Sequence, residues 1–135
     1  MTQENKELLM KDLCARLPHG VKVKLGNNPN IFDLEYRIKF AVMYGDSDKL
    51  EDILDITNIK PYLFPLSSIS IEQEKELSKL GVSYGEYALH DDIRGLGIMV
   101  DEAYIFFEFC YKNHIDFLGL IEMGLAIDAT GKQIY

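Results

Sequence analysis

The chain has 135 residues, of which 47% are apolar and 27% are charged, and its formal net charge at pH 7 is −8. A chain of this length and composition is expected to fold as one domain, residues 1–135, and not to be a disordered segment. Its excess of negative charge repels a phosphate backbone, so direct binding of nucleic acid is not expected.

The cysteines and the N-terminal residues favour a reduced, cytoplasmic location. Cys14 and Cys110 lie far apart in expected helices, unlike the cysteines of a small secreted disulfide scaffold. Residues 1–7 lack the basic start and apolar run of a signal peptide. The longest apolar stretch, residues 104–111, contains Glu108 and is far shorter than the ~20 residues of a membrane span. We therefore expect a cytoplasmic protein that does not contact a membrane.

A helix over residues 3–17 is the first element expected. Apolar residues at spacings of one, three and four form one stripe of it: Leu9, Met10, Leu13, Cys14 and Leu17. Thr2 is the expected N-cap, and the Pro-His-Gly sequence at 18–20 ends the helix, because proline cannot continue the hydrogen-bond ladder. Apolar residues then alternate with Lys22 and Lys24, which predicts a strand over residues 21–25.

The clearest periodic signal lies between positions 32 and 42. Apolar residues occupy every second position, with charged residues between most of them: Phe32, Leu34, Tyr36, Ile38, Phe40 and Val42. This alternation predicts a long half-buried strand with one wet face. Turn-forming residues at 26–30 precede it, so the two strands are expected to pair as an antiparallel hairpin.

Residues 49–59 fit either a helix or a strand, and we favour a third strand. Leu50, Ile53 and Leu54 have helical spacing, whereas the alternation over 54–58 is typical of a strand. The acidic residues that begin at position 46 lack glycine where an EF-hand loop requires it, so no calcium site is expected.

Two prolines shape the next segment, residues 60–66. Pro61 and Pro65 are unfavourable in a regular helix or a central strand, so this segment is predicted to be an extended connector.

The C-terminal half is expected to be mainly helical. Ser70 and Gln73 form a capping box for a helix that reaches about Leu80 and ends at Gly81. Residues 82–89 offer a short strand that extends the sheet.

Two further helices are predicted. Asp101 is the expected cap of a helix over 101–113, whose apolar residues occupy most of its circumference, and a short helix is expected over 116–123. The predicted fold class is therefore α+β, with an N-terminal helix, a small antiparallel sheet of three to four strands and a helical C-terminal half.

Three segments, residues 11–21, 60–68 and 113–126 without Leu118, are familiar together, and the Pro-Tyr-Leu-Phe-Pro-Leu-Ser-Ser run that starts at Pro61 is specific. In this order they resemble a group of small uncharacterised proteins of Bacteroides-type gut bacteria, often found in phage-like or mobile regions. The group has no assigned activity, so no site residue can be transferred from it. The resemblance implies a bacterial, cytoplasmic and accessory protein.

The densest polar cluster in the sequence is a loop with His90, Asp91, Asp92 and Arg94. A histidine beside two carboxylates can act as a general base or a metal ligand. No second histidine, cysteine or serine stands at a recognisable spacing from the loop, so a solvated turn is the favoured interpretation. A small hydrolase or metal-dependent enzyme centred on this loop is the alternative hypothesis for the function.

Other polar and sulfur-bearing residues have structural interpretations. His114 is expected to stabilise one helix C-terminus and Asp116 to cap the next helix. Cys14 and Cys110 fall on apolar stripes, where free cysteine packs as a small hydrophobe. The sequence contains no catalytic motif, and neither a cofactor nor a metal is expected.

Four aromatic residues are the candidates for a binding face: Tyr62, Phe64, Tyr104 and Phe109. Exposed clusters of such residues mark interfaces, although for Tyr62 and Phe64 a role in closing the bottom of the sheet is favoured. The favoured function is a non-enzymatic protein-interaction or regulatory module whose partner is another protein or a second copy of the chain. A third hypothesis, an acidic decoy that mimics nucleic acid, is weakened by the lysines interspersed among the acidic residues.

Overall fold

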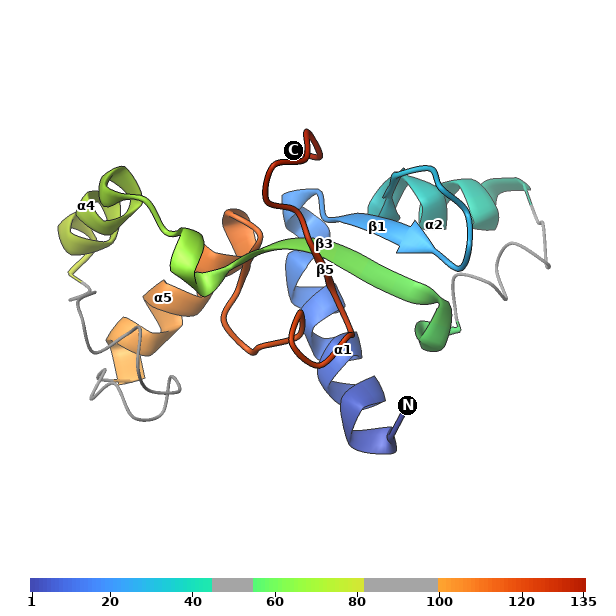
Figure 1. Cartoon of the computed structure of the whole chain (residues 1–135), viewed down its shortest axis with the longest axis horizontal. Coiled ribbons are helices and arrows are strands. Elements are labelled where there is room, and N and C mark those ends of the chain that lie inside the picture. Colours follow the sequence, from blue (N-terminus) through green and yellow to red (C-terminus); the bar gives the residue numbers. More distant parts are fainter. Residues whose placement is uncertain (45–54, 82–99) are drawn as a thin grey trace.

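The computed structural model of the protein describes residues 1–44, 55–81 and 100–135 (Figure 1). Its helices are α1 (Gln3–Arg16), α2 (Leu34–Tyr44), α4 (Ile71–Lys79) and α5 (Val100–Lys112). Its strands are β1 (Lys22–Leu25), β2 (Phe32–Asp33), β3 (Ile59–Pro65), β4 (Ile115–Asp116) and β5 (Ile127–Asp128). None of the helices in these residue ranges combines the length and the apolar character that crossing a bilayer requires. The α+β class is confirmed, and the strand expected at 82–89 lies outside the described residues.

The sheet is mixed, with β3 at its centre. The strand order is β2-β1-β3-β4, and β5 also pairs with β3. β1 is antiparallel to both β2 and β3, with Val23 opposite Phe32 and Pro61, so the predicted hairpin is confirmed in a short form. β4 and β5 run parallel to β3, with Phe64 opposite Ile115 in the first pair. The prediction of an antiparallel sheet is therefore wrong, because the long connection through α4 and α5 returns the chain in the direction of β3.

The ends of α1 are as predicted, but its buried face is different. The Thr2 hydroxyl accepts a hydrogen bond from Asn5 N–H, and Gly20 takes a left-handed φ of 74° after the turn that contains Pro18. The apolar stripe was expected to include Cys14, which is instead exposed, together with Met10. Asp12 and Arg16 lie on the buried face of α1 instead. Their burial is tolerated because their opposite charges are paired.

The predicted long strand over 32–42 is wrong, since only Phe32 and Asp33 are strand and α2 follows at once. Asp33 Oδ1 accepts a hydrogen bond from Tyr36 N–H at 2.9 Å, which is the contact of a helix N-cap. In a helix, Leu34 and Ile38 fall on one face and pack against the core. Tyr36 is then turned outward and is 68% exposed. The apolar residues of this segment fit both the spacing of a strand and the spacing of a helix, and the N-cap contact of Asp33 favours the helix.

The segment before β3 forms a short 3₁₀ helix, Ile56–Asn58. The Asp55 carboxylate accepts a hydrogen bond from Thr57 N–H at 3.1 Å and caps this turn. The favoured third strand over 49–59 is therefore wrong for residues 55–58, whereas residues 45–54 lie outside the described part of the chain.

The predicted connector at 60–66 is instead the central strand, up to Pro65. Pro61 and Pro65 stand two residues before and after Leu63, whose carbonyl accepts a hydrogen bond from Ala129 N–H at 2.8 Å. Successive residues of a strand direct their backbone groups to opposite edges, so Pro61 and Pro65 face the same edge as Leu63. The N–H groups that proline lacks are therefore absent from that edge. Within residues 1–44, 55–81 and 100–135, only the short β5 pairs at that edge, which is why a central strand tolerates two prolines.

The C-terminal half is only partly helical. The capping box of Ser70 and Gln73 and the end of α4 near Leu80 are as predicted, and α5 matches the expected third helix closely. Asp101, its expected cap, lies inside α5. The short helix expected over 116–123 is absent, because Gly119 adopts a left-handed φ of 78° that a helix cannot contain.

Two apolar clusters form the core. The larger one joins α1 to β1 and β3, and it includes Leu9, Val23 and Leu63. The second lies between α4, α5 and β4, and its fully buried members include Leu77 and Phe106. In Figure 1, α1 and the sheet occupy the middle of the molecule, while α2 lies at one end and α4 with α5 at the other.

Candidate functional site

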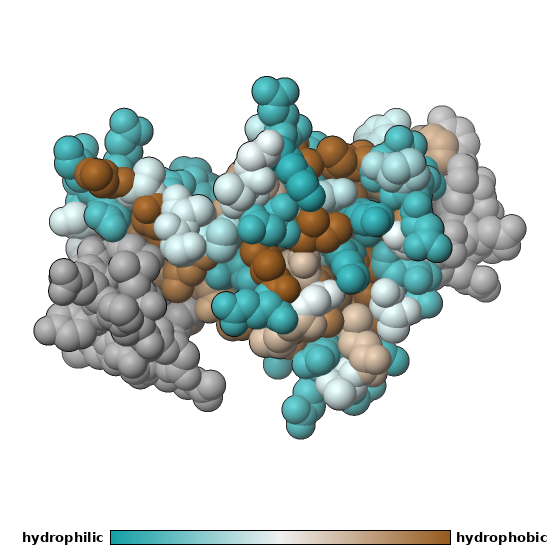
Figure 2. All heavy atoms as spheres, viewed as in Figure 1, coloured by the Kyte–Doolittle hydropathy of each residue, from teal (hydrophilic) through white to brown (hydrophobic). Residues whose placement is uncertain are grey.

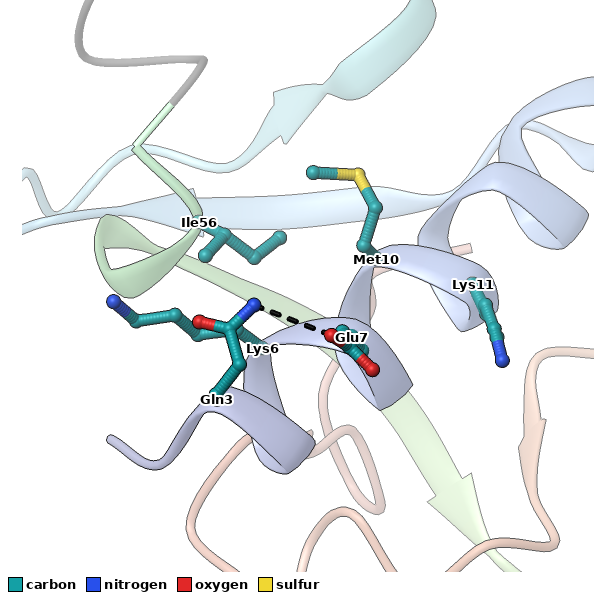
Figure 3. A pocket seen from close by; sticks show the side chains of 6 residues that line it. All are labelled: Gln3, Lys6, Glu7, Met10, Lys11 and Ile56. Carbon is teal, nitrogen blue, oxygen red and sulfur yellow. Dashed lines mark hydrogen bonds between the residues drawn. The ribbon is translucent and has the colours of Figure 1, made fainter.

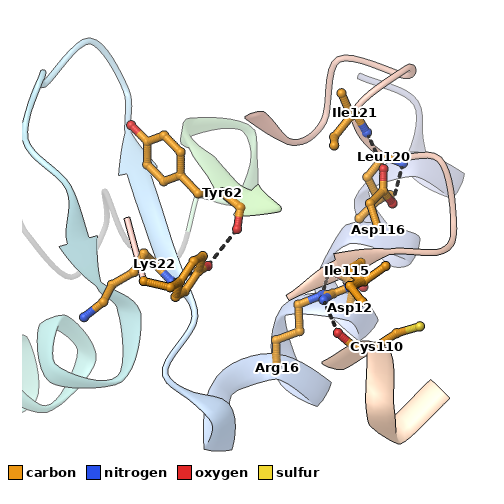
Figure 4. Close-up of polar contacts among 10 residues, drawn as sticks. Asp12, Arg16, Lys22, Tyr62, Cys110, Ile115, Asp116, Leu120 and Ile121 are labelled. Carbon is orange, nitrogen blue, oxygen red and sulfur yellow. Dashed lines mark hydrogen bonds and ion pairs between the residues drawn. The ribbon is translucent and has the colours of Figure 1, made fainter. Parts of the chain in front are cut away.

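A buried ion pair lies at the centre of the molecule, where α1 meets the end of α5 and β4 (Figure 4). Arg16 Nε donates to Asp12 Oδ2 at 2.8 Å, and both side chains have 0% exposure. The two remaining Arg16 nitrogens donate to the carbonyls of Cys110 at 3.2 Å and Ile115 at 2.7 Å. The guanidinium also lies over the Tyr111 ring, 5.3 Å from its centroid. One arginine therefore connects α1 to α5 and β4, which lie 94 and 99 residues further along the chain at the bonded carbonyls.

The electrostatic balance of this pair depends on both partners. Burial raises the pKa of the Asp12 carboxyl above its ordinary value, and the adjacent Arg16 offsets only part of that effect. Among the described residues Asp12 Oδ1 has no hydrogen-bond partner, so within this part of the chain the carboxylate is incompletely satisfied. An ion in this setting is tolerated only while its counterion remains.

Asp116 orders the turn that follows β4. Its two carboxylate oxygens accept hydrogen bonds from the backbone N–H groups of Leu120 and Ile121, each at 2.9 Å. It was predicted to cap a helix, and it caps a turn instead. Because Leu120 is fully buried, this contact fixes the segment against the larger core cluster.

His114 stacks on Tyr135, with ring centroids 3.6 Å apart and an interplanar angle of 10°. The Tyr135 hydroxyl donates to Tyr62 O at 2.7 Å and accepts from Lys22 N–H at 3.0 Å. Burial lowers the pKa of His114 to about 4, so its ring is neutral at pH 7. His114 follows the end of α5, where its backbone N–H donates to Tyr111 O at 3.3 Å, and its neutral ring holds the chain end against β3.

The chemistry of this central network is structural. Burial raises the pKa of the Cys110 thiol to about 12, so it stays protonated and is a poor nucleophile. Within the described ranges, no three histidine, cysteine, aspartate or glutamate side chains are grouped so that they could hold a metal ion. The groups of this network bond to one another and join α1, α5, β4 and the chain end.

The residues of the alternative hypothesis lie outside the described ranges. These are His90, Asp91, Asp92 and Arg94, and the acidic residues of 46–52 lie outside as well. The structure therefore does not test the hydrolase hypothesis, which stays a prediction from sequence.

The four candidate binding aromatics lie on two elements. Tyr62 and Phe64 belong to β3, where Tyr62 is buried and Phe64 lies 6.0 Å from the Tyr135 ring centroid. Tyr104 and Phe109 belong to α5 and line the same surface groove.

This groove lies between the end of α4 and α5 and has a volume of about 290 Å³. We call it the α4/α5 groove, and its lining residues are Glu76, Leu80, Tyr104, Ile105, Glu108, Phe109 and Lys112. Phe109 is 4% exposed, whereas Tyr104 is 72% and Leu80 49% exposed. Apolar atoms are visible at the α4 end of the face in Figure 2. The groove thus presents apolar side chains to solvent between charged ones.

A second hollow lies on the outer face of α1 (Figure 3). It has a volume of about 420 Å³ and is lined by Gln3, Lys6, Glu7, Met10, Lys11 and Ile56. Gln3 Nε2 donates to Glu7 Oε1 at 3.3 Å across it. The sequence interpretation missed this surface because it assigned Met10 to the core. Its charged groups of both signs favour no particular ligand.

One side of α2 carries an apolar stripe, which we call the α2 ridge: Tyr36 and Met43 are exposed, and Phe40 between them is half-buried. The rings of Tyr36 and Phe40 are 6.3 Å apart, and Met43 is 76% exposed. Arg37 lies beside the stripe, with its guanidinium 6.0 Å from the Phe40 centroid. The spacing i, i+4, i+7 could have revealed the ridge, had the segment been interpreted as a helix.

Comparison of the chain with protein-family models, with curated proteins and with solved structures finds no match. Any functional proposal must therefore be based on the site itself.

Proposed function

We propose that this protein is a non-enzymatic protein-interaction module, of the accessory kind found in bacteria and their mobile elements, and that it binds through the α4/α5 groove. The main support for the proposal is the exposure of Tyr104, whose side chain lines an apolar groove and is 72% exposed to solvent. Clustered large apolar side chains at a surface are the usual mark of a protein-binding site.

The composition of the groove supports this proposal. Its floor and walls combine tyrosine, phenylalanine, leucine and isoleucine, and tyrosine is enriched among interface residues that contribute most to affinity. Glu76, Glu108 and Lys112 supply polar groups within the same groove. An apolar centre with polar groups around it is the common anatomy of a non-obligate interface.

The test is affinity capture from the cell that encodes the protein, followed by binding measurements with the purified partner. The double variant Leu80→Asp/Tyr104→Asp places charge in the groove. The control Ile71→Asp places charge on α4 outside the groove lining, at a residue that is 72% exposed, as Tyr104 is. We expect the double variant to bind the identified partner at least about tenfold more weakly, because it buries charge at an apolar contact. The Ile71→Asp control should bind it as the unaltered chain does. The same partner bound equally by all three proteins would contradict the proposal.

A further inference from the structure

Two exposed apolar surfaces formed by described residues have opposite shapes. The α2 ridge is a convex stripe on one helix, and the α4/α5 groove is a hollow between two elements. They lie at opposite ends of the molecule in Figure 1, so one copy cannot bring its own ridge to its own groove.

We propose that the α4/α5 groove of one copy receives the α2 ridge of a second copy, so that chains associate head to tail. The proposal rests on the proposed function of the groove and names its partner.

The geometry of the two surfaces fits this contact. Tyr36, Phe40 and Met43 follow the i, i+4, i+7 spacing with which an amphipathic helix places anchors in an apolar groove. From Tyr36 to Met43 the helix rises about 10 Å at 1.5 Å per residue. The groove, at about 290 Å³, is at the lower limit of small-ligand pockets. It therefore accommodates one or two large anchors and not a whole helix.

The charges beside the two surfaces are complementary. Glu76 lines the groove and can face Lys39, which is exposed beside the ridge, whereas Glu108 Oε1 already lies 3.1 Å from His19 Nε2 of its own copy. Lys112, also in the groove, can face Glu35. Within one copy, Lys39 Nζ lies 2.9 Å from Glu35 Oε1, and an exposed pair of this kind costs little to exchange for contacts with a partner.

The contact predicts a particular kind of assembly. Ridge and groove are different surfaces, so the interface is heterologous, and an open assembly keeps a free ridge at one end and a free groove at the other until a ring closes. The net charge of −8 opposes the approach of two copies at long range. Association should therefore be weak and visible mainly at high protein concentration.

Sedimentation velocity over a range of protein concentrations tests the proposal. We expect the average mass of the unaltered chain to rise with concentration beyond that of two copies. Tyr36→Asp removes an exposed ridge anchor and Tyr104→Asp an exposed groove anchor, so each variant alone should stay monomeric. An equimolar mixture should form two-copy complexes and nothing larger, because one variant supplies an intact groove and the other an intact ridge. The control Ile71→Asp should associate as the unaltered chain does, and Met43→Asp serves as a second ridge variant if Tyr36→Asp does not fold.

The outcomes separate this proposal from the proposed function. A chain that stays monomeric at every concentration overturns head-to-tail association, as does a mixture of the two variants that forms no complex. If Leu80→Asp/Tyr104→Asp then still loses a captured partner, the groove is a binding site for a different protein. If that variant changes neither association nor capture, both proposals fail.

Discussion

The centre and the two ends of this molecule each contain side chains that depart from the usual distribution: a charged pair is buried beside the larger apolar cluster, and apolar groups are exposed at the ends. At the centre, Asp12 and Arg16 are fully buried and bonded to each other. At the ends, Met43 on α2 and Tyr104 in the groove by α5 are more than two thirds exposed, at 76% and 72%. A buried charge is tolerated where its counterion and hydrogen bonds replace water. An exposed aromatic or methionine side chain contributes little to the fold, so a cluster of such residues is the better indication of a binding surface.

The largest effect on stability is expected from Arg16→Met, which tests the contribution of the buried ion pair at the centre. The variant removes the partner of a buried carboxylate and the donor to two backbone carbonyls. We expect the free energy of unfolding to fall by about 3–5 kcal/mol, as measured by urea denaturation at pH 7. The double variant Asp12→Leu/Arg16→Met should lose less than Arg16→Met alone, because it leaves no unpaired charge. A double variant that is less stable than Arg16→Met would contradict this account of the centre.

A pH series tests the neutral state of His114. The pKa of the residue is about 4 in the folded chain and 6.5 ordinarily, so the unfolded chain binds the proton more readily between these values. The contribution of His114 to stability is therefore present above pH 6.5 and is lost as the pH falls toward 4, by about 1–2 kcal/mol at pH 5 when solvent screening of the ring is included. We compare urea unfolding at pH 7 and pH 5 with that of His114→Asn, since asparagine tolerates the left-handed φ of 58° at this position. Equal losses in both proteins would show that His114 is not the group responsible.

A smaller effect is expected from Tyr135→Phe. The variant keeps the ring on His114 but removes the hydroxyl that bonds to Tyr62 O and Lys22 N–H. Leaving these partly buried groups unpaired should cost about 1–2 kcal/mol in urea unfolding. If the cost is absent, water replaces the hydroxyl and the C-terminal contact is not part of the central network.

The smallest effect on stability is expected at the surface. Tyr104→Asp should change the free energy of unfolding by about 0.5 kcal/mol or less, because the Tyr104 side chain is mostly in solvent. Thermal and urea unfolding of the variant at a concentration where the chain is monomeric provide the measurement. A loss of several kcal/mol would mean that Tyr104 belongs to the core, and the contrast between centre and ends would disappear.

Local signals in the sequence predicted the parts of the fold that depend on neighbours in the chain. Thr2 and Pro18 set the ends of α1, and the Ser70 and Gln73 capping box starts α4. These contacts span at most four residues, so their geometry follows from sequence spacing. The aromatic residues Tyr104 and Phe109 could likewise be named from composition, although not their shared groove with Leu80.

The remaining features depend on contacts that spacing does not contain. The donors of Arg16 reach carbonyls 94 and 99 residues away, so nothing local indicates that Arg16 is buried. The strand prediction over 32–42 placed Tyr36 on the buried face, because alternation was considered without the cap at Asp33. β3 can be central despite Pro61 and Pro65 because its pairing with β5 is short and needs few N–H groups from β3. Sequence spacing does not contain this pairing.

Site-directed cross-linking is the most direct test of the claim that the two ends bind each other. One chain carries Met43→Cys on the ridge and another Leu80→Cys in the groove, both with Cys14→Ser, and the mixture is treated with a short bis-maleimide. Cys110 should not compete, because it is buried and its pKa is about 12. The account predicts that mass spectrometry finds mainly the product that joins the two different chains. Products that join only identical chains, or no product at concentrations where the unaltered chain associates, would contradict it.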